Sequence, residues 1–191
     1  VKLKNQQELK GIILDLRGYP GGLLNESVNI SNIFVQRGEE IVSTRGKMKE
    51  WEKIYIATQK AEDTETPLVI LINQSSASAS EIVSGVMQDL DRGVVIGKKS
   101  FGKGLVQQSR KLSYNTQLKV TIAKYYTPSG RCIQALDYSN RNDDGSVGKI
   151  EDSLKTAFKT KNGRTVYDGG GIEPDIKVEQ ASISNITISL L

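Results

Sequence analysis

The segment Pro67-Leu-Val-Ile-Leu-Ile-Asn73 constrains the fold more than any other part of the chain. Its apolar run is too short to cross a membrane and has the length of a strand that is buried on both faces. Apolar residues then repeat at helical spacing, at Ile82, Val83, Val86, Met87 and Leu90. Asp91-Arg92-Gly93 predicts the end of this helix. The sequence therefore predicts a buried strand joined to an amphipathic helix at about residues 80–90.

The neighbouring segments extend this pattern into an α/β domain. Residues 11–16 and 93–97 are short, apolar and bounded by glycine, which predicts two more strands. Residues 25–36 have the spacing of a helix. Strands that alternate with helices favour a central sheet that is at least partly parallel. At 191 residues the chain is long enough for one domain with a substantial core.

Other regions give weaker signals. We expect a helix end at residues 6–10, a strand at 40–44 and a two-faced strand at 116–126. The charged stretch at 45–65 matches no element. Residues 137–170 are polar and rich in glycine, which predicts a surface insertion with a short helix near 153–158. Order is expected to return at 171–176, before a final tail or weak strand.

The chain contains no histidine. This excludes Ser-His-Asp and Cys-His catalysis and the usual zinc and non-haem iron sites, so we expect no metal and no cofactor. A nucleophile here would need a lysine, a carboxylate or a tyrosine as its base. The single cysteine, Cys132, excludes an internal disulfide. A net charge of only +4 with 6% aromatic residues argues against a nucleic-acid surface.

The stretch Gln74-Ser-Ser-Ala-Ser-Ala-Ser-Glu81 joins the central strand to its helix. Hydroxyl groups at this point lie beside free backbone N–H groups, at the positive end of the helix dipole. Such a position suits a nucleophile. It equally suits an ordinary N-cap, and the local sequence alone favours the cap.

Residues 97–104, Gly-Lys-Lys-Ser-Phe-Gly-Lys-Gly, nearly match a phosphate-binding loop after a predicted strand. Gly104 stands where that loop needs a serine or threonine hydroxyl to hold magnesium. The residues after it do not begin a convincing helix. Nucleotide binding is therefore a minor alternative.

Lys103 is the candidate base. A lysine takes this role only when its pKa falls from about 10.4 to about 7–8, and burial supplies such a shift. Apolar neighbours and flanking glycines favour close packing around Lys103, and Gln107 shares its face in a strand or a helix. The alternative is a solvated loop lysine, which is more common.

Five motifs in order resemble the carboxy-terminal processing proteases, or tail-specific proteases, of the S41 peptidase family. The motifs extend over residues 11–176 and are Leu16-Arg-Gly-Tyr-Pro-Gly-Gly22, Ser76-Ala-Ser-Ala-Ser-Glu-Ile82, Phe101-Gly-Lys-Gly-Leu-Val-Gln107, Tyr126-Thr-Pro-Ser-Gly130 and Gly171-Ile-Glu-Pro-Asp175. Each motif is weak by itself. Their common order makes the resemblance specific, although Tyr19 stands where the family commonly has asparagine.

The resemblance implies a role for each matching position. Ser78, the middle serine of its motif, would be the nucleophile, Lys103 the general base and Gln107 the residue that holds the lysine. The backbone N–H groups of Gly22 and Ala79 would form the oxyanion hole. The implied fold is similar to crotonase and ClpP, with stacked β-β-α units.

The resemblance also implies a serine endopeptidase that cleaves proteins in or near unstructured C-terminal regions, in a bacterial periplasm or cell envelope. The family's PDZ domain is not recognisable in residues 1–191, so we expect a single S41-type core without it. The chain starts at Val1 without Met, which suggests part of a longer, processed protein, so the absence of a visible signal peptide or membrane segment says little about location. Homo-oligomerisation stays open. The alternative from another class is a non-catalytic binding or scaffold module of the same fold.

Overall fold

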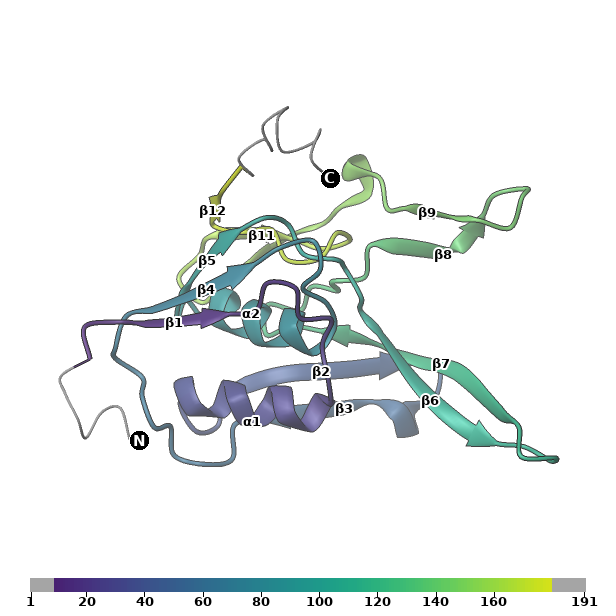
Figure 1. Cartoon of the computed structure of the whole chain (residues 1–191), viewed down its shortest axis with the longest axis horizontal. Helices are drawn as coiled ribbons and strands as arrows, with labels where there is room; N and C mark the ends of the chain where they lie inside the picture. Colours follow the sequence, from purple (N-terminus) through teal and green to yellow (C-terminus); the bar gives the residue numbers. More distant parts are fainter. Residues whose placement is uncertain (1–8, 180–191) are drawn as a thin grey trace, which may run out of the picture.

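The computed structural model describes residues 9–179, which form two four-stranded sheets with two α-helices (Figure 1). The first sheet is parallel, in the order β1 (Ile12–Asp15), β4 (Leu68–Ile72), β5 (Val94–Gly97) and β12 (Ile176–Lys177). The second is antiparallel, in the order β3 (Lys53–Ile56), β2 (Glu40–Gly46), β7 (Gln117–Tyr126) and β6 (Leu105–Lys111). The expected mixed α/β fold with a parallel central sheet is confirmed.

The core lies around α2 (Ala79–Asp89), which packs between β5 of the first sheet and β2 of the second (Figure 1). Helix α1 (Leu24–Phe34) packs beside α2 and β2. Strand β4 buries Leu68, Ile70 and Ile72 on one face, whereas Val69 and Leu71 on the other face are half-buried. The expectation that this strand is buried on both faces is therefore wrong, since α2 covers only one of them. Within residues 9–179, neither helix is long and apolar enough to span a bilayer.

The C-terminal end of α2 is held by a buried ion pair. The Arg131 guanidinium donates to the Asp89 carboxylate at 2.8 Å and to the Gln88 side-chain oxygen at 2.7 Å, and almost no surface of either charged side chain is exposed. The Gln88 amide donates in turn to Asp175 at 2.9 Å. Because Asp175 lies just before β12, this hydrogen bond fixes α2 to that segment. Asp175 also accepts the Val95 N–H, which connects the cluster to β5.

The expected elements are largely confirmed for the two helices and for the strands at β1, β2, β4, β5 and β7. The unassigned stretch at 45–65 contains β3 and a single 3-10 turn, η1 (Lys49–Trp51). The helix expected near 153–158 is wrong. A 3-10 turn, η2 (Asp152–Leu154), and strand β10 (Ala157–Lys159) occupy that region. Residues 9 and 10 are not helical, and the other residues of the expected helix end lie outside the described residues, as does most of the final tail.

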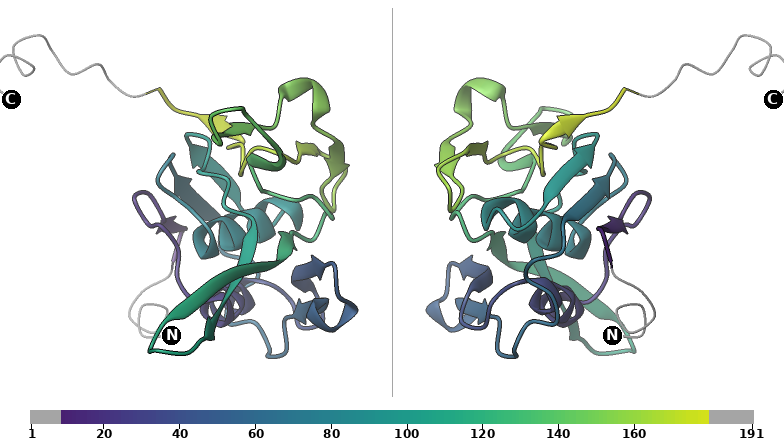
Figure 2. Two further views of the ribbon diagram at one scale, coloured as in Figure 1. Left: turned by 90° about the vertical axis from the view of Figure 1, so that its right-hand side faces the viewer. Right: turned by 90° about the vertical axis from the view of Figure 1, so that its left-hand side faces the viewer.

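The polar region at 137–170 forms two antiparallel ribbons (Figure 2). One pairs β8 (Leu136–Arg141) with β9 (Val147–Lys149), and the other pairs β10 with β11 (Thr165–Tyr167). The turn of the second ribbon contacts the end of α2, since the Lys161 N–H donates to the Asp89 carbonyl at 2.7 Å. This region therefore supports the core helix as well as contributing surface.

Candidate active site

The turns after β1 and β4 lie side by side, because neighbouring parallel strands end at the same edge of a sheet. The Asn73 side-chain oxygen accepts the N–H groups of Gly18 and Ser75, both at 3.0 Å. The Ser76 hydroxyl donates to the Leu16 carbonyl at 2.8 Å, and the Ser80 hydroxyl donates to the Tyr19 carbonyl at 3.0 Å. The first two sequence motifs thus form one structural unit.

Ser78 is the N-cap of α2, with backbone angles φ 55° and ψ −115°. A residue with a side chain rarely adopts this conformation, which costs on the order of 1–3 kcal/mol. Ser80, where the sequence predicts the helix to begin, is not the cap, because its hydroxyl donates to the Tyr19 carbonyl. Among the described residues, the Ser78 hydroxyl donates a hydrogen bond to no acceptor. A strained serine between a strand and a helix is also the geometry of the nucleophile elbow in other hydrolases.

Glu81 connects Ser78 to the loop that carries Lys103. One oxygen of its fully buried carboxylate accepts the N–H groups of Ser78 and Lys103, both at 2.8 Å. The other oxygen accepts the Gly102 N–H at 2.7 Å and the Ser100 hydroxyl at 2.5 Å. Burial raises the pKa of Glu81 above its ordinary value, while the four donors favour its charged form. The backbones at Ser78 and Lys103 therefore lie next to each other.

Sequence reasoning did not single out Glu81 as a site residue. The signal was present, because a serine followed three residues later by glutamate is the capping-box pattern, and the two residues do form that box here. The pattern predicts the contact with Ser78. It does not predict the contacts with Ser100, Gly102 and Lys103, since these come from a loop about twenty residues further along the chain.

Lys103 lies between two buried glycines, but its own side chain is exposed. A Cβ at Gly102 would lie 2.4 Å from the Ala135 Cβ, and one at Gly104 would lie 2.7 Å from the Gln134 N. The loop backbone packs closely at these glycines, as expected. The expected burial of the lysine itself is wrong, because the loop turns its glycines and not Lys103 toward the core. Residues 9–179 do not supply the burial that a lysine base requires.

The remaining candidates lie around this loop. Gln107 is exposed on β6, where it pairs with Thr121 beside a bulge in β7. Gly21, at φ +106°, abuts the serine: a Cβ there would lie 2.7 Å from the Ser78 Cβ and 3.0 Å from the Ala79 N. Gly22 has open space around it. The structure thus places the Gly21–Gly22 turn against Ser78, with Gly21 as the glycine that the packing requires.

The last two motifs support the same loops. A Cβ at Gly85 of α2 would lie 2.9 Å from the Thr127 methyl group, so the turn at 127–130 packs directly on this helix. The Ile172 N–H donates to the Ser100 hydroxyl at 2.6 Å. Ser100 therefore connects Glu81 to the 171–175 motif. In residues 9–179, no group of three or more His, Cys, Asp and Glu side chains is placed to hold a metal ion.

Residues 1–139 match the family model described as peptidase family S41. The chain belongs to this family. A carboxy-terminal-processing protease of Bartonella bacilliformis is 47% identical over 129 residues, which cover 68% of this chain and 30% of the relative. A probable CtpA-like serine protease of Staphylococcus aureus is 41% identical over 205 residues, which cover 94% of this chain and 41% of the relative.

Solved structures agree with this assignment. A photosystem II D1 C-terminal processing protease superposes with a TM-score of 0.68 at 30% identity, over 93% of this chain and 36% of that protein. An S41 protease from Bacteroides fragilis, described as putative, has a TM-score of 0.60 at 13% identity, which supports the fold alone. The chain thus spans well under half the length of these S41 relatives. Four of the five motifs identified in the sequence lie within residues 1–139, and the motif at 171–175 lies after them.

Proposed function

We propose that this chain is the core of a serine endopeptidase in which Ser78 is the nucleophile and Lys103 the general base. The observation that carries the proposal is the Glu81 carboxylate, which holds the strained Ser78 backbone and the Lys103 backbone on a single oxygen. Neither serine beside it fits the role as well, because the hydroxyls of Ser76 and Ser80 donate to backbone carbonyls.

The proposed reaction runs through an acyl-enzyme. Neutral Lys103 accepts the hydroxyl proton of Ser78 while the oxygen of Ser78 attacks the scissile carbonyl carbon. The N–H groups of Gly22 and Ala79 stabilise the oxyanion, and each such donor is worth on the order of 10²–10³ in rate. The carbon–nitrogen bond then breaks as Lys103 returns the proton to the leaving amine. A water molecule deacylates Ser78 with Lys103 again as base, and Gln107 orients the lysine.

The proposed substrate class rests on the names of the relatives. Two relatives are named for C-terminal processing, and we propose that this chain likewise acts in or near unstructured C-terminal regions of proteins. Because Lys103 is exposed, a bound substrate or another segment of a longer protein would have to cover it during catalysis. A periplasmic or cell-envelope location and a crotonase-like stacking of β-β-α units remain predictions of the family resemblance.

Kinetics of the longer parent protein test this assignment. In that protein, Ser78→Ala and Lys103→Ala should each lower kcat/KM for an unfolded protein substrate by about 10³-fold or more. Ser75→Ala is the matched control, since Ser75 is exposed in the same loop and should leave the rate unchanged. Full activity of either dyad variant would overturn the proposal.

The exposure of Lys103 also favours a second candidate, a non-catalytic binding module with the same fold. A lysine that acts as a base requires burial, which residues 9–179 do not give Lys103. Cleavage of an unfolded substrate distinguishes the two candidates. The module would bind unfolded substrates without cleaving them, and Ser78→Ala would change nothing.

A further inference from the structure

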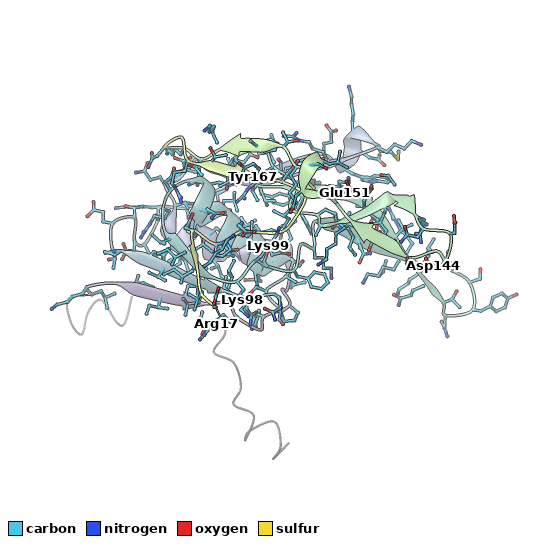
Figure 3. All side chains as sticks on the ribbon, turned by 90° about the horizontal axis from the view of Figure 1, so that it is seen from above. Arg17, Lys98, Lys99, Asp144, Glu151 and Tyr167 are labelled. Atoms are coloured by element: carbon cyan, nitrogen blue, oxygen red, sulfur yellow. The ribbon has the colours of Figure 1, made fainter. Side chains whose placement is uncertain are left out.

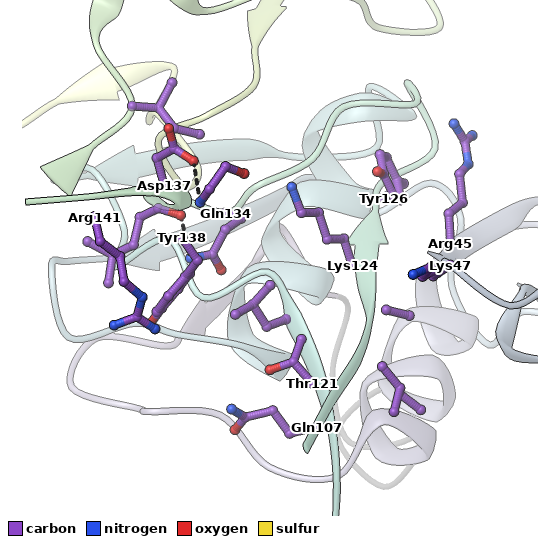
Figure 4. Close-up of a pocket in the computed structure, with 17 residues that line it drawn as sticks. Arg45, Lys47, Gln107, Thr121, Lys124, Tyr126, Gln134, Asp137, Tyr138 and Arg141 are labelled. Atoms are coloured by element: carbon purple, nitrogen blue, oxygen red, sulfur yellow. Dashed lines mark hydrogen bonds between the residues drawn. The ribbon is translucent and has the colours of Figure 1, made fainter. Parts of the chain in front are cut away.

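A pocket of about 730 Å³ lies between β7 and β8, and we call it the basic groove (Figure 4). Its walls come from the end of β2, the start of β6, the second half of β7 and strand β8. The side chains of Arg45, Lys47, Lys124 and Arg141 surround it, together with Tyr126 and Tyr138. Its volume is in the range of sites that hold an organic ligand or a short peptide segment.

The charges of the basic groove are unbalanced. Four cationic side chains line it, whereas Asp137 is the one carboxylate among the lining residues. None of the four cations forms an ion pair with a carboxylate in the described part of the chain. Arg45 instead lies over the Tyr126 ring, 4.4 Å from its centre. The groove therefore has a local excess of positive charge, in a chain whose net charge is only +4.

Several cations elsewhere on the surface are paired with carboxylates. Arg17 pairs with Asp15 at 2.7 Å, Lys177 pairs with Glu173 at 2.6 Å, and Arg164 pairs with Asp91 at 2.6 Å. Figure 3 shows Arg17 and Lys98 together at one edge of the molecule, where they line a smaller cavity of about 450 Å³. The guanidinium in that cavity already has its carboxylate partner. The basic groove is therefore the better site for an anionic ligand.

The lining also favours a peptide over a bare anion. The lining also includes the apolar side chains of Leu105, Ile122, Leu136 and Ile150, and the polar side chains of Gln107 and Thr121 supply hydrogen-bond donors. A wall that combines apolar contacts with cations fits an extended polypeptide that presents both apolar residues and carboxylates. A nucleic acid would gain less from the apolar part, and stacked bases would need more exposed aromatic surface.

The basic groove lies beside the strand that follows the Lys103 loop. Leu105 and Gln107 line the groove and lie two and four residues after Lys103 on the same loop and strand. We infer that the basic groove binds an acidic, partly apolar segment of a protein substrate next to the bond that is cleaved. This inference deepens the proposed function and rests on it for the position of the scissile bond.

Fluorescence anisotropy of a labelled peptide tests the inference. The probe is an extended peptide of roughly ten residues that alternates glutamate with valine and leucine, and its partner has glutamine in place of glutamate. Both are titrated with the Ser78→Ala form of the chain, which cannot turn them over. We expect the acidic peptide to bind about tenfold more tightly, with a preference that falls as salt rises from about 0.05 to about 0.5 M.

Paired variants locate the binding. Lys47→Gln with Lys124→Gln should weaken binding of the acidic peptide about tenfold and leave the glutamine peptide unchanged. Lys111→Gln with Lys119→Gln is the matched control, because it removes the same charge from exposed positions of β6 and β7 outside the groove. Circular dichroism of both double variants, recorded before each titration, checks that they are folded.

Three outcomes would overturn the inference. They are equal affinity for the two peptides, an equal loss in both variant pairs, and tighter binding of a single-stranded oligonucleotide with the same charge. A different result would overturn the proposed function without overturning this inference. If the groove variants lose binding as expected but Ser78→Ala leaves the parent's cleavage intact, then the groove is correct and the dyad is wrong.

Discussion

Helix α2 is fixed at both ends by a buried carboxylate, but the two ends use opposite chemistry. At the N-terminal end, Glu81 accepts four hydrogen bonds from neutral donors, three of them backbone N–H groups. At the C-terminal end, Asp89 pairs with the buried guanidinium of Arg131. The C-terminal end is held by charge pairing, and the N-terminal end is held without a cation.

This difference suits the two ends to different tasks. An ion pair holds a helix end well but fills the space with two side chains, and its removal leaves a buried charge. Backbone donors instead position the main chain at Ser78 and Lys103 and leave their side chains free to face a substrate. The C-terminal end of α2 is therefore structural, whereas the N-terminal end presents the residues that we propose for catalysis.

Breaking the ion pair should have the largest effect on stability. Arg131→Met leaves Asp89 buried without its cation, which should lower the free energy of unfolding by about 3–5 kcal/mol in urea denaturation. The double variant Arg131→Met with Asp89→Leu should recover most of that loss, because no buried charge remains. A double variant as unstable as Arg131→Met would show that packing, and not charge, dominates this end.

Glu81→Gln should cost less stability but more function. The amide group of glutamine donates where the carboxylate accepts, so at least one donor is left unpaired, at a cost of about 1–3 kcal/mol. Peptidase activity of the parent protein should fall much further than this loss of stability explains, because the backbones of Ser78 and Lys103 separate. Activity that only follows the folded fraction would mean that Glu81 is a simple helix cap.

The Gly21–Gly22 turn provides a matched pair at the same end of α2. Gly21→Ala places a methyl group against the Ala77 carbonyl at a positive φ, so it should destabilise the fold by more than about 1 kcal/mol. Gly22→Ala meets open space and should leave stability unchanged within about 0.5 kcal/mol. Thermal unfolding of both variants measures the contrast. Equal losses of stability would show that Gly21 is not the glycine required by the close packing against Ser78.

The exposed pair of Asp15 and Arg17 should give the smallest effect. Hydrogen bonds from Arg17 lower the pKa of Asp15 to about 2. Because this pKa is depressed, the pair stabilises the fold above about pH 4, and that contribution is lost as pH falls toward 2. Arg17→Gln should raise the pKa of Asp15 toward about 3.9 in an NMR titration. An unchanged pKa of Asp15 in this variant would show that Arg17 does not cause the low value.

The sequence was sufficient for much of this picture. The apolar runs at β4 and α2 have clear periods, which predict both elements within one or two residues. The family motifs predict Ser78, Lys103 and Gln107 as site residues, and their roles stay a prediction. Local patterns failed where distant segments decide the result. The exposure of Lys103 depends on how its loop packs on Ala135, and the four partners of Glu81 meet only in three dimensions. The ribbons at 137–170 lack strong periodicity, so their strands were missed.

The central claim is that Ser78 is a nucleophile that depends on Lys103 and on the carboxylate between them. Its most direct test is mass spectrometry of the protein after reaction with an acylating β-lactone, with the modified residue located by peptide mapping. A single adduct on Ser78 is expected, and it should be absent in Ser78→Ala and strongly reduced in Lys103→Ala and Glu81→Gln. An adduct on Ser76 or Ser80, or labelling of Ser78 that Lys103→Ala leaves unchanged, would contradict the account.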